Sequence, residues 1–224
     1  MTATGAASAA ARKAVAILIS GRGSNMAALI DAAAAAGYPA RIALVISNRA
    51  NAEGLAEARA KGIATAVIES KGRDRAAFDA ELDARLKQDG IEIVCLAGFM
   101  RLLTPGFVQG WQGRMINIHP SLLPAFKGLD VHRRVVEAGA KITGCTVHFV
   151  VPEMDDGPII AQAAVPVPDG ATPDDVAAAV LAQEHVIYPA ALRWLAEGKL
   201  AVSGNSVTMR GAGSAEGALI SPRP

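Results

Sequence analysis

The sequence predicts an α/β fold: a mostly parallel, twisted sheet with helices on both faces and an antiparallel addition in the C-terminal half. Three observations support this prediction. Short apolar runs alternate with helical patterns along the first hundred residues, and the connections between them are short. Two β-rich runs follow one another in the second half. Such alternation is typical of parallel strands joined by right-handed crossovers.

The first half of the chain alternates strand and helix patterns. Continuous apolar runs are typical of buried parallel strands, and glycine often ends a helix. Strands are predicted over residues 14–20, 41–47, 64–69 and 91–97. Helices are predicted over residues 24–36, 51–61 and 74–88, and each ends within two residues of a glycine.

The second half is less regular. A strand is predicted over residues 114–119, ending at Pro120, and a short helix over 130–138. The β-rich runs 142–151 and 159–167 are predicted to pair as a hairpin-like antiparallel addition. Thr172 with Pro173 and two following acids is a strong helix start. That helix should continue to about residue 197, with Pro189 as the position for a bend.

The chain reads as one domain over residues 14–202, because its middle contains no linker rich in proline and glycine. Residues 1–13 are small and rich in alanine, and they are predicted to form a flexible extension. Their positive charges follow the apolar residues, which is the reverse of a secretory signal. Residues 203–224 are predicted to form a short strand or hairpin and then a tail.

Composition excludes several classes of function. The formal net charge is +1, so the chain has neither the basic surplus of nucleic-acid binding proteins nor a polybasic membrane patch. No apolar stretch is long enough to span a bilayer. Cys95 and Cys145 are too far apart for a redox motif or zinc site, which favours reduced thiols in a cytoplasmic protein. The oligomeric state stays open, with a homodimer among the options.

A glycine-rich loop follows the first strand and opens the first helix. Gly23, Ser24 and Asn25 place backbone N–H groups and polar side chains where a helix N-terminus attracts an anion. Met26 occupies the third glycine position of the dinucleotide-binding pattern, so that motif is absent. Arg22 could add positive charge or point into water. A phosphate loop and a tight turn capped by serine explain this segment equally well.

The predicted strand over residues 114–119 brings an amide and an imidazole together. Alternate residues of a strand share a face, so Asn117 and His119 should project together at its end. If that strand is parallel to the others, they lie at the edge where open α/β sheets bind ligands. The imidazole can move a proton near neutral pH, and the amide can stabilise an oxyanion. Simple capping of the strand end is the alternative.

An acidic turn connects the two later β-rich runs. Glu153, Asp155 and Asp156 lie among proline and glycine residues over 151–158. Such a turn is either solvated or folded so that one carboxylate contacts His119. A carboxylate there would stabilise the charged imidazole.

Taken together, these segments resemble the folate-dependent glycinamide ribonucleotide formyltransferases. The resemblance covers about residues 14–200, and the pattern of INIHPSLLP, HFV and D-x-G-P is specific to folate formyl transfer. The glycine loop narrows it to the glycinamide ribonucleotide branch. The matching segments are AILISGRGSN (16–25), VISN (45–48), CLAGFMRLL (95–103), INIHPSLLP (116–124), GCTVHFV (144–150), DDGPII (155–160) and QEHVIYP (183–189).

The resemblance implies a Rossmann-like fold and transfer of a formyl group from 10-formyltetrahydrofolate to the amine of glycinamide ribonucleotide, in purine synthesis and without a metal. Asn117, His119 and Asp155 would be catalytic. Asp156 occupies a position where the family often has glycine, so either of the two aspartates could be the carboxylate that faces His119. Gly23, Ser24 and Asn25 would hold the substrate phosphate, and Glu184 its ribose. The implied folate-binding residues are Arg75, Met100, Arg101, Leu102, Leu103, Asn117, Val151, Pro152, Glu153, Met154 and Asp155.

Three other functions are alternatives to glycinamide ribonucleotide formyl transfer. A formyltetrahydrofolate deformylase would share the amide, imidazole and carboxylate but use water as the acceptor. A methionyl-tRNA formyltransferase would carry a further C-terminal domain and a basic surplus. A nucleotide- or folate-binding module without catalysis is the alternative from a different class. His148 is predicted to support the site, and His185 to be a helix residue near it.

Overall fold

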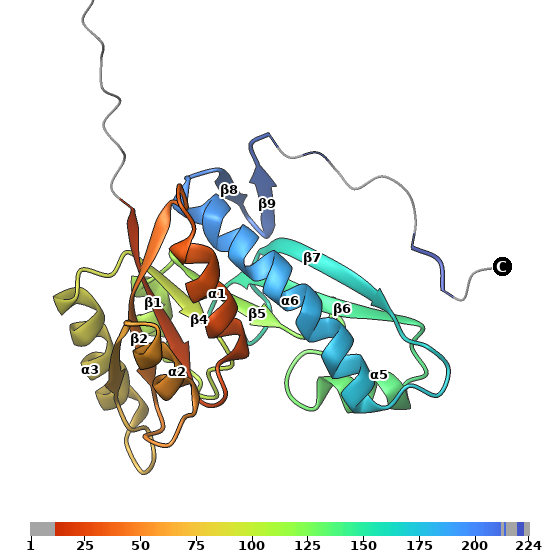
Figure 1. Ribbon diagram of the computed structural model, residues 1–224, viewed down its shortest axis with the longest axis horizontal. Helices are drawn as coiled ribbons and strands as arrows, with labels where there is room; N and C mark the ends of the chain where they lie inside the picture. The colour runs from red at the N-terminus through yellow and green to blue at the C-terminus, as the bar shows by residue number, and fades with distance from the viewer. Residues whose placement is uncertain (1–11, 212, 214–218, 222–224) are drawn as a thin grey trace, which may run out of the picture.

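The computed structural model describes residues 12–211, 213 and 219–221 (Figure 1). Seven strands in this part of the chain form one sheet in the order β3-β2-β1-β4-β5-β6-β7, and β8 and β9 form a separate hairpin. The strands are β1 (Lys13–Ile19), β2 (Ala40–Ser47), β3 (Ala64–Val67), β4 (Ile93–Leu96), β5 (Met115–His119), β6 (Ile142–Phe149), β7 (Ile159–Pro166), β8 (Leu200–Ser203) and β9 (Ser206–Met209).

Strands β1 to β5 are parallel, whereas β6 and β7 are antiparallel to their neighbours. The predicted fold class and the antiparallel addition are therefore confirmed. The carboxyl ends of β1, β4 and β5 meet at one edge because these strands run side by side in the same direction. This edge carries the glycine loop, the 97–103 segment and the end of the Asn117 strand.

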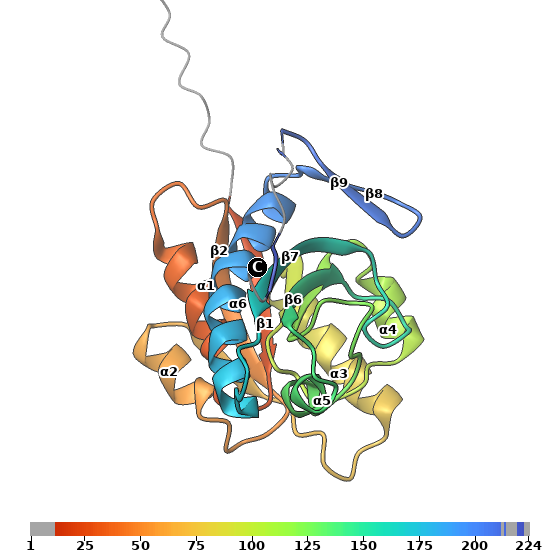
Figure 2. The same cartoon turned by 90° about the vertical axis from the view of Figure 1, so that its right-hand side faces the viewer.

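Helices cover both faces of the sheet (Figure 2). One face packs against α1, α2, α5 and α6, and the other against α3 and α4. Alternate residues of β1 enter the two cores: Ile17 faces the first layer and Leu18 the second. The helices are α1 (Ser24–Ala34), α2 (Gly54–Ala60), α3 (Arg75–Gln88), α4 (Pro105–Gly110), α5 (Val131–Glu137) and α6 (Pro173–Ala196).

Helix α6 begins as predicted and continues through Pro189. Thr172 and Asp175 form a reciprocal capping box, and Pro173 occupies the first turn. The hydroxyl of Tyr38 donates to the carbonyl of Pro189 at 2.6 Å. The hydroxyl of Tyr188 lies 2.9 Å from the carbonyl oxygen of Leu96 in β4. This long helix is therefore anchored to the segment before β2 and to the end of β4, and the latter borders the site. No described helix is long and apolar enough to cross a membrane.

Several elements differ from their predicted bounds. Helix α4 was not predicted, although Thr104 and Pro105 repeat the cap and first-turn proline of α6. It is only six residues long and contains two glycines, so its helical signal is weak. Helix α2 starts at Gly54, three residues later than predicted, and β3 ends at Val67. The terminal hairpin begins at Leu200, whereas residues 1–11 and most of the predicted tail lie outside the described residues.

Candidate active site

Four polar side chains meet beside the end of β5. Asn117 pairs with His148 across β5 and β6, and directly opposed residues share a face of the sheet. The amide nitrogen of Asn117 lies 3.2 Å from Nε2 of His148. Asp155 reaches this group from the 150–158 loop, with Oδ2 3.4 Å from Nδ1 of His119 and Oδ1 3.9 Å from Nε2 of His148. The predicted trio is therefore brought together, and His148 completes the cluster.

His119 contacts an oxygen atom on each side of its ring. Nδ1 faces Asp155, and Nε2 lies 3.0 Å from the carbonyl oxygen of Phe126. A neutral imidazole carries one N–H and can donate to only one of these oxygens, whereas the imidazolium can donate to both. The ring of His119 is therefore held between a carboxylate and a backbone carbonyl oxygen.

The tautomer of His148 follows from its neighbours. Burial, helped by the charges of His119 and Lys127, lowers the pKa of this ring against the opposing influence of the Phe149 carbonyl and Asp155. Nδ1 lies 2.8 Å from the carbonyl oxygen of Phe149, so this nitrogen donates. Nε2 then accepts from the Asn117 amide, which fixes the orientation of the amide. His148 thus supports Asn117, in agreement with its predicted role.

The two adjacent aspartates have different surroundings. Oδ2 of Asp155 accepts the backbone N–H of Gly128 at 2.9 Å, and its side chain is 11% exposed. Asp156 is 53% exposed and pairs with Lys127 at the surface. Asp155 has a left-handed backbone conformation, with φ of 53°. This turn directs Asp155 inward, so Asp155 is the carboxylate that faces His119.

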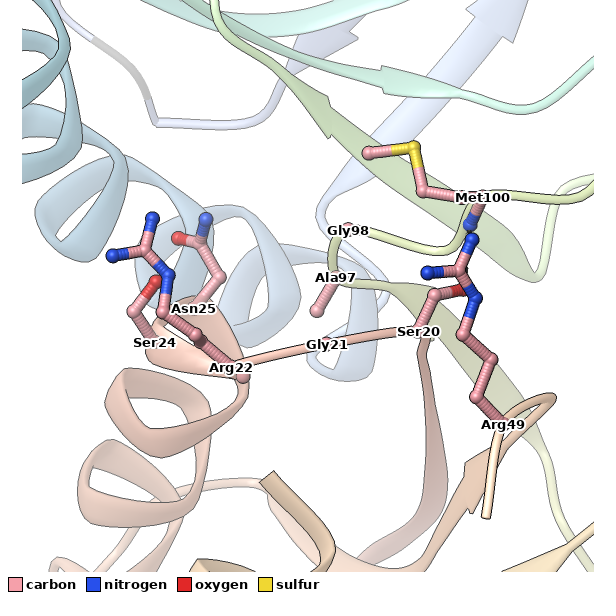
Figure 3. A pocket seen from close by; sticks show the side chains of 10 residues that line it. Ser20, Gly21, Arg22, Ser24, Asn25, Arg49, Ala97, Gly98 and Met100 are labelled. Carbon is pink, nitrogen blue, oxygen red and sulfur yellow. Dashed lines mark hydrogen bonds between the residues drawn. The ribbon is translucent and has the colours of Figure 1, made fainter. Parts of the chain in front are cut away.

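The glycine loop forms the wall of a cavity of about 290 Å³. Gly23 precedes α1 in the left-handed conformation, with φ of 81°, and its Cα packs against Gly54. Figure 3 shows Arg22, Ser24 and Asn25 at one end of this cavity and Arg49 at the other. No acidic residue lines it among those described. The cavity therefore suits an anion, which α1 attracts through its unpaired N–H groups.

Glu184 lies directly behind the glycine loop. Its Oε2 accepts the side-chain N–H of Asn25 at 2.7 Å. Burial raises the pKa of Glu184, and the hydrogen bond from Asn25 opposes this shift. One N–H of the Asn25 amide is therefore used within the protein, and the loop's backbone, Ser24 and the two arginines also line the cavity for an anion.

A second cavity, of about 930 Å³, adjoins the first and reaches the polar cluster. Exposed apolar side chains border it, including Met100, Leu102 and Met154. Its size and mostly apolar wall suit a large, flat ligand with a few polar contacts. The predicted residues that line it are Ser24, Asn25, Met100, Arg101, Leu102, Leu103, Asn117, His119, Val151, Pro152, Glu153, Met154, Asp155 and Glu184.

Two predicted residues have different positions from the rest. Gly23 lines the smaller cavity. Arg75, the first residue of α3, lines neither of the two cavities among the described residues. The backbone N–H of Met100 donates to the hydroxyl of Ser20 at 2.7 Å and is therefore not free for a ligand.

The structure adds residues that sequence reasoning missed. His132 of α5 lines the larger cavity, and burial together with the nearby charge of His119 lowers its pKa. Arg49 lines the smaller cavity from the end of β2. Its position directly after the VISN segment could have indicated it, because that segment follows a parallel strand. Among the described residues, no group of three or more histidines, cysteines or acids could hold a metal ion.

Comparison with known proteins gives consistent matches over this fold. The formyl transferase family model matches residues 13–192. The chain is 46% identical to phosphoribosylglycinamide formyltransferase of Escherichia coli, covering 88% of this chain and 93% of that protein. A crystal structure of glycinamide ribonucleotide transformylase 1 from Symbiobacterium toebii superposes with a TM-score of 0.86 at 46% identity, covering 88% and 94% of the two chains.

A second group of relatives is much longer. The chain is 50% identical over 192 residues to the trifunctional purine biosynthetic protein adenosine-3 of Bos taurus. This match covers 85% of the present chain and 19% of the bovine protein. The chain therefore spans about a fifth of the length of these trifunctional relatives.

Proposed function

This chain belongs to the formyl transferase family, and we propose that it transfers the formyl group of 10-formyltetrahydrofolate to the amine of glycinamide ribonucleotide. The products are formylglycinamide ribonucleotide and tetrahydrofolate, and the reaction is a step of purine synthesis. Residues 14–202 are the proposed catalytic domain. The relatives named for this activity support the assignment at high identity and coverage.

One observation carries the proposal. Asn117, His119 and Asp155 meet on the wall of the larger, mostly apolar cavity, and Ser24 and Asn25 of the glycine loop line both this cavity and the smaller one. A ligand anchored by its phosphate on the loop can extend past Glu184 toward these residues. A folate in the larger cavity can present its formyl group from the opposite side. The two reactants then meet at the polar cluster, which is the requirement for direct transfer.

The mechanism uses the cluster without an acyl-enzyme. The substrate amine forms a bond to the formyl carbon, and the formyl oxygen becomes negatively charged. Asn117 donates to this oxygen through an amide that His148 already orients. His119 donates through Nε2 after exchanging its bond to the Phe126 carbonyl for one to the oxygen. Donors held in place before the reaction stabilise the developing charge most effectively.

Asp155 and His119 also serve the second half of the reaction. Asp155 holds Nδ1 of His119, so the ring keeps its orientation and its positive charge is stabilised. The carbon–nitrogen bond to the folate breaks as a proton moves from the attacking amine to the leaving nitrogen. His119 is placed to transfer that proton, directly or through water. No step in this mechanism requires a metal.

We place the enzyme in the cytoplasm, with its two small substrates as partners and without nucleic acid. The formal net charge of +1 supports the absence of a nucleic-acid partner. Both cysteines are free and buried, and burial raises the pKa of Cys95 to about 12, which suits reduced thiols. Sedimentation of the purified chain distinguishes a monomer from a homodimer.

A single assay separates this function from its rivals. The purified chain is given 10-formyltetrahydrofolate, either with glycinamide ribonucleotide or with water as the only acceptor. We expect formylglycinamide ribonucleotide to form, and formyl loss to be negligible without the ribonucleotide. Rapid loss to water alone would identify a deformylase. Binding of both ligands without turnover would identify a binding module.

A further inference from the structure

A buried serine connects the two parts of the proposed site. Ser20 follows β1 and begins the glycine loop, and only 4% of it is exposed. Its hydroxyl oxygen accepts the backbone N–H of Met100 at 2.7 Å and donates to Oδ1 of Asn48 at 2.6 Å. Met100 belongs to the 98–103 segment, which lines the larger cavity. The hydroxyl of Ser20, at the start of the glycine loop, therefore contacts the 98–103 segment that lines the larger cavity.

The directions of these two hydrogen bonds are determined by the groups involved. The N–H of Met100 can only donate, so the single proton of the Ser20 hydroxyl is available to Asn48. Both bonds are short, and both serine and asparagine are buried. Removing this hydroxyl leaves a donor and an acceptor without partners, which costs more than the loss of one exposed bond.

The hydrogen-bonded chain continues beyond Asn48. Nδ2 of Asn48 donates to the hydroxyl of Ser70 at 3.0 Å. Nη1 of Arg101 donates to the carbonyl of Ser70 at 3.0 Å, and the guanidinium lies 4.6 Å from the centre of the Phe78 ring. The 98–103 segment is thus held at Met100 and again at Arg101 by two ends of one polar network.

The 98–103 segment has irregular backbone and is held mainly by side chains: Phe99 and Leu103 pack against the second core, and Arg101 donates to the carbonyls of residues 70, 73 and 74. It lies between β4 and α4 and belongs to neither a helix nor a strand. Before it, Ala97 donates to the carbonyl of Leu18 at 2.9 Å, and after it, Thr104 donates to Asp79 at 2.6 Å. Within the described chain, the hydrogen bond from Met100 to Ser20 joins this segment directly to the start of the glycine loop. Figure 3 shows Ser20 and Met100 at the same end of the smaller cavity.

We propose that the Ser20 hydroxyl is a positioning group that couples the two substrate subsites. An anion bound to residues 21–25 restrains Ser20, and Ser20 restrains the 98–103 segment in the geometry that receives the folate. The inference rests on the proposed function for the identity of the two ligands. Coupling of this kind is reciprocal, because each ligand must raise the affinity for the other by the same factor.

Calorimetry with two unreactive ligands tests the proposal. Tetrahydrofolate is titrated into the full chain with and without saturating glycinamide ribonucleotide. Neither ligand carries a formyl group, so no transfer occurs. We expect the ribonucleotide to tighten tetrahydrofolate binding about five- to tenfold in the wild type, within the usual range of coupling. In Ser20→Ala we expect both ligands still to bind, and the ribonucleotide to leave the affinity for tetrahydrofolate nearly unchanged.

Matched variants separate coupling from general damage. Ser47→Ala removes another buried hydroxyl, whose bonds at 2.8 and 3.0 Å reach only the backbone of Arg49. In this variant the ribonucleotide should raise the affinity for tetrahydrofolate as much as it does in the wild type. Ser70→Ala removes the outer partner of Asn48 and leaves the bond from Met100 to Ser20, so most of the coupling should remain. If Ser20→Ala does not fold, Ser20→Cys replaces the hydroxyl with a weaker thiol and should give an intermediate factor.

Two results would overturn the proposal. One is independent binding of the two ligands in the wild type, which requires no variant. The other is full coupling in Ser20→Ala. If neither ligand binds the wild type, the proposed function fails and the coupling fails with it. If both bind without mutual effect, only the coupling is lost.

Discussion

Oδ2 of Asp155 lies 3.4 Å from Nδ1 of His119, although His119 ends β5 and Asp155 belongs to the loop between β6 and β7. The same oxygen accepts the backbone N–H of Gly128 at 2.9 Å. Asp155 therefore joins three segments: the end of β5, the loop that follows it and its own turn. This relationship determines which carboxylate can act on the imidazole.

Replacing either member of this pair should reduce turnover. We expect His119→Ala and Asp155→Asn each to lower kcat by roughly a hundredfold or more, because an acid–base or oxyanion group is lost. Asp156→Asn is the matched control, since Asp156 pairs with Lys127 at the surface. Steady-state kinetics on the three purified variants gives the comparison. Similar losses in both aspartate variants would contradict the assignment of Asp155.

Acid should destabilise the wild type partly through His148. Burial holds the folded-state pKa of this ring below its ordinary value of 6.5, so the unfolded state binds its proton first as the pH falls. The stability associated with the neutral ring is complete above pH 6.5 and is lost as the pH falls toward the folded-state pKa. This site alone changes stability by at most about 1.4 kcal/mol per pH unit.

The non-titrating variant His148→Gln isolates this effect. Urea unfolding at pH 7.5 and 5.5 should show a steeper loss of stability in the wild type than in the variant. His132 has a lowered pKa as well, but it titrates in both proteins and cancels in the comparison. Parallel slopes in the two proteins would mean that His148 is not held neutral in the fold.

A negative charge in the glycine loop should impair binding of the ribonucleotide. Ser24→Asp places a carboxylate in the first turn of α1, where the substrate phosphate is proposed to bind. We expect KM for glycinamide ribonucleotide to rise at least about tenfold, because like charges about 4 Å apart repel by several kcal/mol at a surface. Ser24→Ala is the neutral control. An unchanged KM for the ribonucleotide in Ser24→Asp would count against the loop assignment.

The glycine that follows the two aspartates should tolerate no side chain. A Cβ at Gly157 would lie 1.8 Å from the carbonyl oxygen of Phe149, which is rigid backbone. Gly157→Ala should reduce the free energy of unfolding by roughly 3 kcal/mol or more. Gly106→Ala in α4 meets no atom within 4 Å and should stabilise the helix by roughly 0.5–1 kcal/mol. Thermal and urea unfolding of both variants measures the contrast.

The sequence predicted most of the fold because its elements have strong local signals. Buried parallel strands such as β1 are continuously apolar, and α6 begins with a cap, a proline and acids. Helix α4 was missed because six residues with two glycines carry little propensity. The exact start of α2 at Gly54 depends on its packing against Gly23, which no local pattern reveals.

By itself, the sequence determined the α/β class, the glycine loop and the shared face of Asn117 and His119, because strand periodicity and glycine chemistry are local properties. Only the tertiary structure decided that Asp155 rather than Asp156 faces His119, since a left-handed turn at Asp155 sets which side chain points inward. It also brought His148 to Asn117 and Met100 to Ser20. Such contacts depend on strand register and loop geometry, which arise when distant segments pack together.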